Sequence, residues 1–451
     1  MPIRRKLSRC QALLLFALLA LTAGAVTIAG TLTFTNTPLL RPEGDSEPAI
    51  SIGPSSTMAI TGLRWLAFGT NLWTGPTGST PTYRGVIDAA LQQPGRSVLG
   101  GGDADVDIGS TGTLHETSLV FLVNKPFTAA TLGVAAVTCP DATSSSFNIS
   151  SCKSQVLDKA GADRQWITSE HSTVYISYHD SGSSSLIHVQ RSDDDGFTWQ
   201  KVGDPIVGQG RLTGFATFNN TQGPIVADPH TGNVYAIYSA GEPSVQKGTS
   251  GAYNNILVSR STDKGVTWTA TVVFHAPLFT NFSNVFPALA VDPTNGDLYA
   301  TWSDAHHVFF SRSTDQGVTW SPAVTVNAAP ALTAIFPWVA AYNGTVDVVY
   351  YGTSAASKDD TTAVWNVYLA QTVNGGTTFR QSRVSNTPNH VGVICTEGTG
   401  CAPGTRNLLD LFEVAINPQT GLAGVIYTDD TLTKTSSGSP LPQIVLAQQN
   451  P

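Results

Sequence analysis

The stretch Phe286-Pro-Ala-Leu-Ala-Val-Asp-Pro-Thr-Asn-Gly-Asp-Leu-Tyr-Ala-Thr-Trp302 holds two short apolar runs on either side of an Asp-Pro-x-x-Gly turn. Alternating apolar residues over short runs predict β-strands, and the Asp, Pro and Gly predict a tight turn between them. A near copy is Gly223-Pro-Ile-Val-Ala-Asp-Pro-His-Thr-Gly-Asn-Val-Tyr-Ala-Ile-Tyr238, and a third runs from Leu411 through Asn417-Pro418-Gln-Thr-Gly421 to Tyr427. The sequence therefore predicts a repeated β-hairpin.

Looser copies of this phrase begin at four more positions, Glu47, Gly102, Arg164 and Phe336. The units lie roughly 50 to 75 residues apart, a spacing typical of propeller blades. No stretch after the first 25 residues shows a sustained helical period. We predict an all-β chain that forms a single β-propeller of seven four-stranded antiparallel blades, with six blades as the alternative. Pairing of residues 443–447 with a strand near residues 32–34 is expected to close the ring.

A second motif, S-x-D-x-G-x-T-W, occurs three times in full and once in a decayed form at Asn374. An Asp at this place can cap backbone N–H groups, the Gly supplies a positive φ, and the Trp buries a large apolar face. We expect these residues to be structural: Asp194, Asp263, Asp315, Trp199, Trp268 and Trp320. A calcium ion at residues 193–195 is the alternative, but calcium takes 6–8 oxygen ligands.

The three matches resemble the Asp-box, or bacterial neuraminidase repeat, of sialidases, over residues 186–380. The resemblance implies a sialidase-like glycoside hydrolase in which the Asp-boxes lie away from the catalytic face. Such a site uses three arginines to bind a carboxylate, a Tyr nucleophile with a Glu base, and an Asp acid. The chain departs from this pattern because it lacks an [FY]-R-I-P motif, and its nearest string is Tyr83-Arg84-Gly85-Val86.

The resemblance also implies that residues before each inner strand, Glu47 among them, converge at the propeller axis. Three arginines there are predicted to bind substrate, namely Arg164, Arg211 and Arg406. Trp166 and Trp338 are predicted to stack on a sugar ring. The predicted catalytic acids are Asp103, Asp105 and Asp410. The alternative for all eight residues is a structural role, in ion pairs and apolar packing that seal the channel.

The N-terminus predicts export. Basic residues up to Arg9, an apolar run over residues 12–21 and Ala23-Gly24-Ala25 indicate a cleaved signal peptide over residues 1–25 rather than a membrane anchor. Residues 26–42 are expected to form a strand and linker, and residues 43–451 the propeller. Four cysteines of the exported chain are expected to pair locally as Cys139–Cys152 and Cys395–Cys401, with a thiolate metal site as the alternative.

These features predict a secreted or periplasmic glycoside hydrolase that acts on extracellular glycans. A non-catalytic propeller that binds glycan or protein is the alternative, and a surface assembly factor is a third hypothesis. The net charge of −8 argues against a nucleic-acid partner. No cofactor and no metal are expected, although adjacent His306 and His307 leave a metal site open. No second apolar run reaches membrane length, and the oligomeric state stays open.

Overall fold

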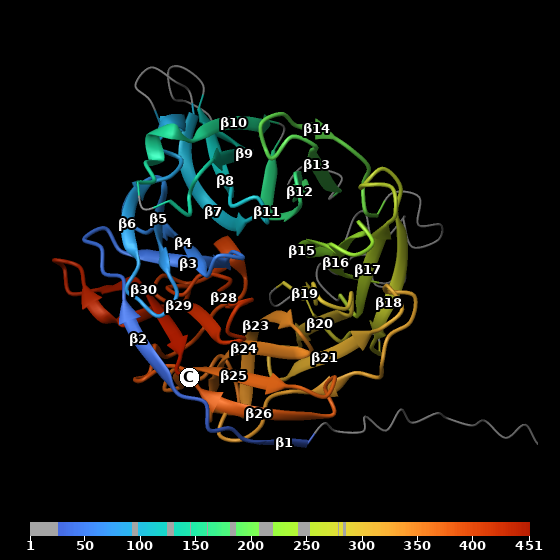
Figure 1. The fold of residues 1–451 in the computed structure, drawn as a ribbon. Helices are drawn as coiled ribbons and strands as arrows, with labels where there is room; N and C mark the ends of the chain where they lie inside the picture. Colours follow the sequence, from blue (N-terminus) through green and yellow to red (C-terminus); the bar gives the residue numbers. More distant parts are fainter. Residues whose placement is uncertain are drawn as a thin grey trace, which may run out of the picture.

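Seven β-sheets surround a central axis in the computed structural model of the chain (Figure 1). The model describes residues 26–92, 98–123, 130–144, 146–159, 161–180, 186–206, 220–241, 253–277, 279–282 and 286–451. Within these ranges the only helical segments are short 3-10 turns such as Ala89–Gln92. The predicted seven-bladed, all-β propeller is therefore confirmed, and the six-bladed alternative is excluded.

The first three blades each contain four consecutive antiparallel strands, with the first strand nearest the axis. Blade 1 contains β3 (Asp45–Ile52), β4 (Thr57–Arg64), β5 (Thr70–Pro76) and β6 (Thr82–Val86). Blade 2 contains β7 (Val98–Ile108), β8 (Leu114–Val123), β9 (Ala130–Cys139) and β10 (Lys153–Asp158). Blade 3 contains β11 (Ala162–Glu170), β12 (Thr173–Asp180), β13 (Ile187–Ser192) and β14 (Gln200–Lys201).

The next three blades repeat this order. Blade 4 contains β15 (Asn220–Ala227), β16 (Val234–Ala240), β17 (Asn255–Ser261) and β18 (Thr269–His275). Blade 5 contains β19 (Ala288–Val291), β20 (Leu298–Ser303), β21 (Val308–Ser313) and β22 (Val324–Thr325). Blade 6 contains β23 (Thr333–Tyr342), β24 (Thr345–Thr353), β25 (Val364–Thr372) and β26 (Thr378–Arg383), with β1 (Val26–Ala29) parallel to β26 and β27 (His390–Val391) paired with β25.

Blade 7 closes the ring with strands from both ends of the chain. Its members are β28 (Glu413–Ile416), β29 (Ala423–Lys434), β30 (Pro440–Gln449) and the N-terminal β2 (Phe34–Pro38). Strand β2 pairs antiparallel with β30, and Thr37 lies opposite Leu446. The predicted partner strand near residues 32–34 is thus present and begins at Phe34. Closure satisfies the edge of β30, which would otherwise expose unpaired backbone groups.

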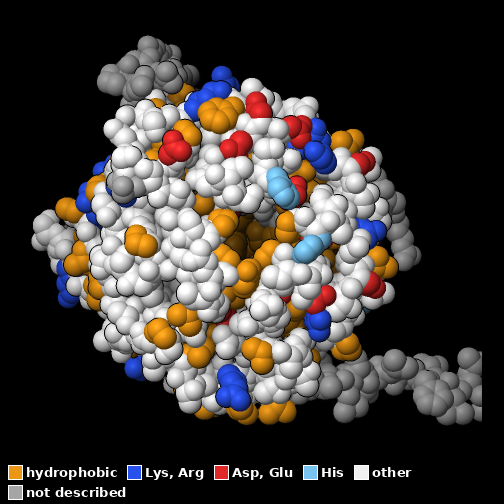
Figure 2. Space-filling model, in the orientation of Figure 1, with side chains coloured by type: hydrophobic (Ala, Val, Ile, Leu, Met, Phe, Trp, Pro, Cys, Tyr) orange, Lys and Arg blue, Asp and Glu red, His pale blue; other side chains and the backbone are white. Residues whose placement is uncertain are grey.

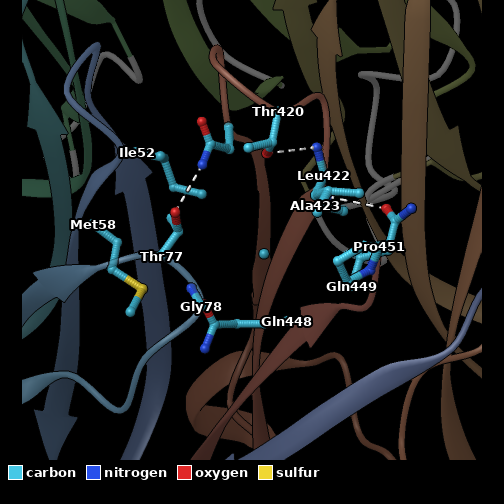
Figure 3. A pocket seen from close by; sticks show the side chains of 12 residues that line it. Ile52, Met58, Thr77, Gly78, Thr420, Leu422, Ala423, Gln448, Gln449 and Pro451 are labelled. Atoms are coloured by element: carbon cyan, nitrogen blue, oxygen red, sulfur yellow. Dashed lines mark hydrogen bonds between the residues drawn. The ribbon is translucent and has the colours of Figure 1, made fainter.

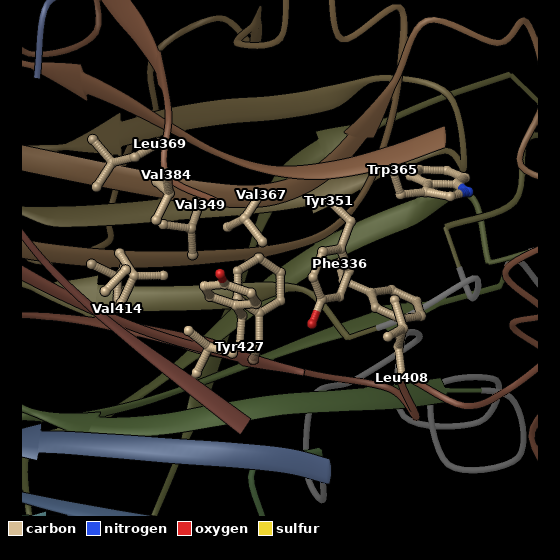
Figure 4. Packing of buried hydrophobic residues seen from close by; sticks show 14 of the residues in the cluster. Phe336, Val349, Tyr351, Trp365, Val367, Leu369, Val384, Leu408, Val414 and Tyr427 are labelled. Atoms are coloured by element: carbon tan, nitrogen blue, oxygen red, sulfur yellow. The ribbon is translucent and has the colours of Figure 1, made fainter. Parts of the chain in front are cut away.

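Apolar cores fill the spaces between neighbouring blades. Figure 4 shows the core between blades 6 and 7, where Val349 and Val367 of blade 6 face Val414 and Tyr427 of blade 7. All four side chains are buried. Burial of a Val side chain contributes about 1.5–3 kcal/mol, so alternating apolar residues on successive strands hold the blades together.

The S-x-D-x-G-x-T-W hairpins are fastened by side chains. Asp263 accepts hydrogen bonds from Ser261 Oγ at 2.8 Å and from the Thr267 backbone N–H at 2.8 Å, and Trp268 Nε1 donates to the Gly265 carbonyl at 2.9 Å. The same carboxylate contacts occur at Asp194 and Asp315. The three Trp side chains pack against cores between blades, and they are Trp199, Trp268 and Trp320.

These hairpins also join blade 3 to blade 4 and blade 4 to blade 5. Arg191 Nη1 of blade 3 donates to the Lys264 carbonyl in the hairpin of blade 4 at 2.9 Å. Arg260 Nη1 of blade 4 donates to the Gln316 carbonyl of blade 5 at 3.1 Å. The S-x-D-x-G-x-T-W hairpins therefore stabilise contacts between neighbouring blades as well as the turn within each blade.

Both predicted disulfides are present. Cys139–Cys152 closes a loop at the end of β9, and Cys395–Cys401 lies in the segment that leads into blade 7. Disulfides are typical of oxidising compartments, which fits an exported protein. No helix in the described ranges is long and apolar enough to cross a membrane. The predicted signal peptide, residues 1–25, lies outside the described residues.

Candidate functional site

The inner strands of blades 1, 3 and 6 are irregular near their first residues. In blades 1, 3 and 6 the pairing between the first two strands shifts at a non-glycine residue with positive φ, and these residues are Glu47 (50°), Arg164 (55°) and Phe336 (58°). Bulges of this kind re-aim a side chain, and a left-handed non-glycine residue costs about 1–3 kcal/mol. Glu47 and Arg164 join the ionic cluster described below, whereas Phe336 is 1% exposed and packs in the apolar core between blades 6 and 7.

Arg164 is the centre of an ionic cluster built from four blades. Its Nη1 lies 2.9 Å from Glu47 Oε1 and 2.8 Å from Asp103 Oδ2, and its Nη2 contacts Asp410 Oδ2. Arg406 also bonds Asp410, with Nε 3.2 Å from Oδ1. We call Glu47, Asp103, Asp163, Arg164, Arg406 and Asp410 the axial cluster.

The pKa values of three carboxyl groups of the axial cluster are shifted in different directions. Burial raises the pKa of Glu47 well above its ordinary value, and the charge of Asp103 adds to the rise. Burial and then Asp103 likewise raise the pKa of Asp163. At Asp410 burial acts in the same direction, but the guanidinium groups of Arg164 and Arg406 outweigh it and lower the pKa. Pairs of carboxyl groups with pKa values pushed apart are how active sites divide acid and base roles.

Aromatic rings support the cluster from blades 3 and 5. The guanidinium carbon of Arg164 lies 4.5 Å from the ring centroid of Phe286, a cation–π contact. Trp166 packs edge-on against the same ring at 5.1 Å and is only 1% exposed. Its ring therefore packs beneath Arg164 in an apolar core. Trp338 is half-buried and packs against three apolar cores.

The structure brings together four of the eight predicted site residues. Arg164, Arg406, Asp103 and Asp410 meet in the axial cluster. Asp105 lies deeper along β7, where its two oxygens accept from the backbone N–H groups of Val106 at 2.7 Å and Ile167 at 2.8 Å. Arg211 lies outside the described residues.

Besides Glu47, which was expected at the axis, two further acids belong to the region and were not among the predicted catalytic residues. Asp163 is partly exposed beside Arg164, whose backbone N–H it accepts at 3.0 Å. Glu413 is the first residue of β28, the inner strand of blade 7. A charged residue at the first position of a buried inner strand is the signal that identifies Glu413 in the sequence. For Asp163 the signal is its place directly before Arg164.

The side chains considered as alternative metal ligands contact other protein groups in the structure. Asp193 pairs with Arg191 Nη2 at 2.9 Å, whereas Asp195 accepts from Thr113 Oγ1 at 2.5 Å. His306 Nδ1 lies 3.0 Å from Thr333 Oγ1. Across the described ranges, no group of three or more His, Cys, Asp or Glu side chains is arranged to hold a metal ion.

A small cavity of about 180 Å³ lies at the seam between blades 7 and 1 (Figure 3). Its walls include Ile52, Met58 and Leu422. Asn417 Nδ2 at its edge donates to Thr77 Oγ1 at 2.8 Å, so these polar groups are satisfied across the seam. We assign this cavity to imperfect packing where the ring closes.

Comparisons with known proteins do not identify a family. No protein-family model matches the chain, and no curated protein matches it. Similar solved structures include an intramolecular trans-sialidase from Ruminococcus gnavus, with 12% identity over 90% of this chain and 94% of that chain and a TM-score of 0.40. An α-L-arabinofuranosidase of Fusarium graminearum has 12% identity over 75% and 97%, with a TM-score of 0.48. An Aleuria aurantia lectin has 13% identity over 76% and 96%, with a TM-score of 0.45.

Proposed function

We propose that this chain is a secreted glycoside hydrolase that acts on extracellular glycans through the carboxyl groups of the axial cluster. The observation that carries the proposal is the set of acids around Arg164, drawn from several blades and held with pKa values shifted in opposite directions. Glycoside hydrolysis needs one carboxylic acid that protonates the leaving oxygen and one carboxylate on the other side of the bond.

Asp163 fits the role of the general acid that protonates the leaving oxygen. It is partly exposed, and burial beside Asp103 raises its pKa, so its proton is retained to higher pH than in a free Asp. In this role Asp163 gives that proton to the glycosidic oxygen as the bond to the anomeric carbon breaks. Asp103, with a side chain 17% exposed, supplies the carboxylate that stabilises the positive charge developing on the sugar.

Asp410 and Glu47 fit supporting roles. Both are buried, and their oxygens contact Arg164. In these positions they hold the guanidinium in place between blades 1, 3 and 7. Asp105 is bound by two backbone N–H groups, which suits a structural acid of the inner strand.

An uncharged glycan suits this site better than a sialic acid. Arg164 already faces three carboxylates, and Arg406 is paired with Asp410. A substrate carboxylate would have to displace these partners in a cluster of four acids and two arginines. The sialidase-type clamp of Arg164, Arg211 and Arg406 is therefore the less favoured form of the proposal.

Hydrolysis of a panel of 4-methylumbelliferyl pentosides and hexosides by the purified full-length protein tests this function, with the N-acetylneuraminide as the charged comparison. We expect turnover of an uncharged glycoside and a lower kcat/KM in Asp163→Asn, with a smaller fall than on an alkyl glycoside because the phenolic leaving group needs less protonation. The matched control is Asp347→Asn, which changes a buried acid of β24 in blade 6. Turnover of the N-acetylneuraminide alone would establish the sialidase form.

A non-catalytic propeller is the second candidate, because the ion pairs of Arg164 also fit a purely structural role. Glycan binding measured on an array, without hydrolysis of any glycoside, would favour it. Equal turnover of a glycoside by wild type and Asp163→Asn would contradict the assignment of Asp163 as the general acid.

A further inference from the structure

The channel along the axis has mainly apolar walls, which offer few partners to the hydroxyl groups of a sugar. The inner strands of all seven blades line it, and most of the lining residues are Val, Ile, Leu, Ala or Pro. Figure 2 shows a hollow at the centre of the ring with hydrophobic side chains around it. A sugar held at the axial cluster therefore finds its hydroxyl partners among polar residues beside the cluster rather than along the channel.

His179 lies directly opposite the proposed general acid in blade 3. Strands β11 and β12 pair antiparallel, and Asp163 of β11 is in register with His179 of β12. Directly opposed residues of an antiparallel pair project to the same face of the sheet, with Cβ atoms about 4.5–5.5 Å apart. Both side chains are partly exposed. His179 is therefore the cross-strand neighbour of Asp163, within reach of the same bound sugar.

A residue of the next blade fixes the imidazole ring of His179. Asn220 is the first residue of β15 in blade 4 and is 5% exposed, and its Oδ1 lies 2.9 Å from His179 Nε2. A carboxamide oxygen can only accept a hydrogen bond, so Nε2 carries the hydrogen in this contact. The face of blade 3 that carries Asp163 and His179 is thus turned towards blade 4.

The second ring nitrogen of His179 has no partner within the described ranges. Nδ1 makes no hydrogen bond there and is absent from the buried atoms that lack a partner, so it is open to solvent. Burial lowers the pKa of His179 below its ordinary value, although the hydrogen bond with Asn220 and the charge of Asp180 act in the opposite direction. The ring is therefore neutral at neutral pH, and with the hydrogen on Nε2 its Nδ1 is an acceptor.

We propose that His179 Nδ1 accepts a hydrogen bond from a hydroxyl group of the sugar whose glycosidic oxygen Asp163 protonates. The inference rests on the proposed function, because the place of the sugar follows from the role of Asp163. A hydroxyl group has the hydrogen that this acceptor needs, whereas a carboxylate has none. His179 thus favours an uncharged sugar and fixes its orientation, and it takes no part in proton transfer.

Titration calorimetry of the full-length protein at neutral pH tests the contact with sugars that resist hydrolysis. The probes are the methyl 1-thioglycosides of glucose, galactose, mannose, xylose and arabinose, followed by the monodeoxy derivatives of each sugar that binds. We expect at least one thioglycoside to bind, and the loss of one hydroxyl group to weaken its binding about five- to tenfold.

The variant His179→Gln isolates the acceptor. It keeps an N–H for Asn220 Oδ1 but has no acceptor at the place of Nδ1. This variant should bind the parent thioglycoside as weakly as the wild type binds the critical deoxy sugar, and it should not distinguish the two sugars. A general disturbance of the site would instead weaken the binding of both sugars alike.

Two further variants keep the test decisive. His179→Ala also removes the acceptor and should lose the same discrimination, so the result does not depend on one substitution. His275→Gln changes an exposed histidine that contacts Asn255 Oδ1 from the outer strand of blade 4, and it should leave the binding of every sugar unchanged.

The outcomes separate the role of His179 from that of Asp163. No binding of any thioglycoside by the wild type, or unchanged discrimination between parent and deoxy sugars in the His179 variants, would overturn the proposal. Equal weakening of both sugars in these variants would also overturn it. Loss of discrimination in His179→Gln, together with no turnover of any glycoside by the wild type, would support the hydroxyl contact and contradict the hydrolytic role of Asp163.

Discussion

The guanidinium group of Arg164 in blade 3 contacts the carboxylate of Asp410, which lies 246 residues further along the chain. The two residues belong to segments that enter blades 3 and 7, so the contact spans the axis rather than joining neighbouring blades. Asp410 is also bound by Arg406. The axial cluster therefore joins blade 3 to the segment that leads into blade 7, which closes the ring.

Replacement of Arg164 should destabilise the whole propeller. Arg164→Gln leaves Glu47, Asp103 and Asp410 without their shared cation, and breaking a buried ion pair costs about 3–5 kcal/mol. Urea denaturation monitored by near-UV circular dichroism measures the loss. Arg383→Gln, at an exposed arginine, should change the free energy of unfolding by less than about 0.5 kcal/mol. Equal effects of the two substitutions would show that the cluster contributes little stability.

Stability should fall as the pH rises towards neutrality. Burial raises the pKa of Asp347 from 3.8 to about 7, opposed only by a hydrogen bond from Gln371. The folded state thus holds a proton that the unfolded chain releases, and the resulting stabilisation is complete below pH 3.8 and lost as the pH rises through about 7.

The variant Asp347→Asn isolates this group. It should flatten the decline in the free energy of unfolding by up to about 1.4 kcal/mol per pH unit between these limits. Urea titrations at several pH values across this range measure the slope. Burial also raises the pKa of Asp105 to about 7, and its contribution to the slope is present in both the wild type and Asp347→Asn. The difference between the two slopes therefore reports on Asp347. Identical slopes for the variant and the wild type would contradict the assignment to Asp347.

Loss of one hairpin cap should cost a modest amount of stability. Asp263→Ala removes the acceptor for Ser261 and Thr267, and we expect the free energy of unfolding to fall by about 1 kcal/mol. Asp263→Asn should cost less, because Asn374 makes the equivalent contacts with its amide oxygen. Thermal denaturation with Lys264→Ala as the adjacent control measures the effect. A larger loss in the Asn variant than in the Ala variant would refute the capping role.

Much of the fold was predictable because its signals are local. The Asp-Pro-x-x-Gly turn and the capped hairpin each depend on residues within a few positions of one another. Their repetition then indicated seven blades, and the pairing of residues 443–447 with the N-terminal strand followed from the need to close the ring. The disulfides Cys139–Cys152 and Cys395–Cys401 were predictable for the same reason, since each joins residues close in sequence.

The site was predictable only in part because its geometry is set by register. Arg164 and Asp410 were both expected at the axis. Their contact depends on a bulge between Asp163 and Gln165, which no sequence motif predicts. Asp103 and Asp105 lie two residues apart on β7, yet the first joins the axial cluster and the second binds backbone groups below it. A shift of one residue in the pairing of β7 would have exchanged inward-facing and outward-facing positions.

The proposed proton donor can be tested through the leaving group of the substrate. The measurement is kcat/KM of wild type and Asp163→Asn on an alkyl glycoside and a 2,4-dinitrophenyl glycoside of the uncharged sugar that the panel identifies. A good leaving group departs without protonation, so the variant should lose about 10²–10⁴-fold on the alkyl glycoside and little on the dinitrophenyl glycoside. Equal losses on both substrates, or no hydrolysis by the wild type, would contradict the assignment of the axial cluster as a hydrolytic site.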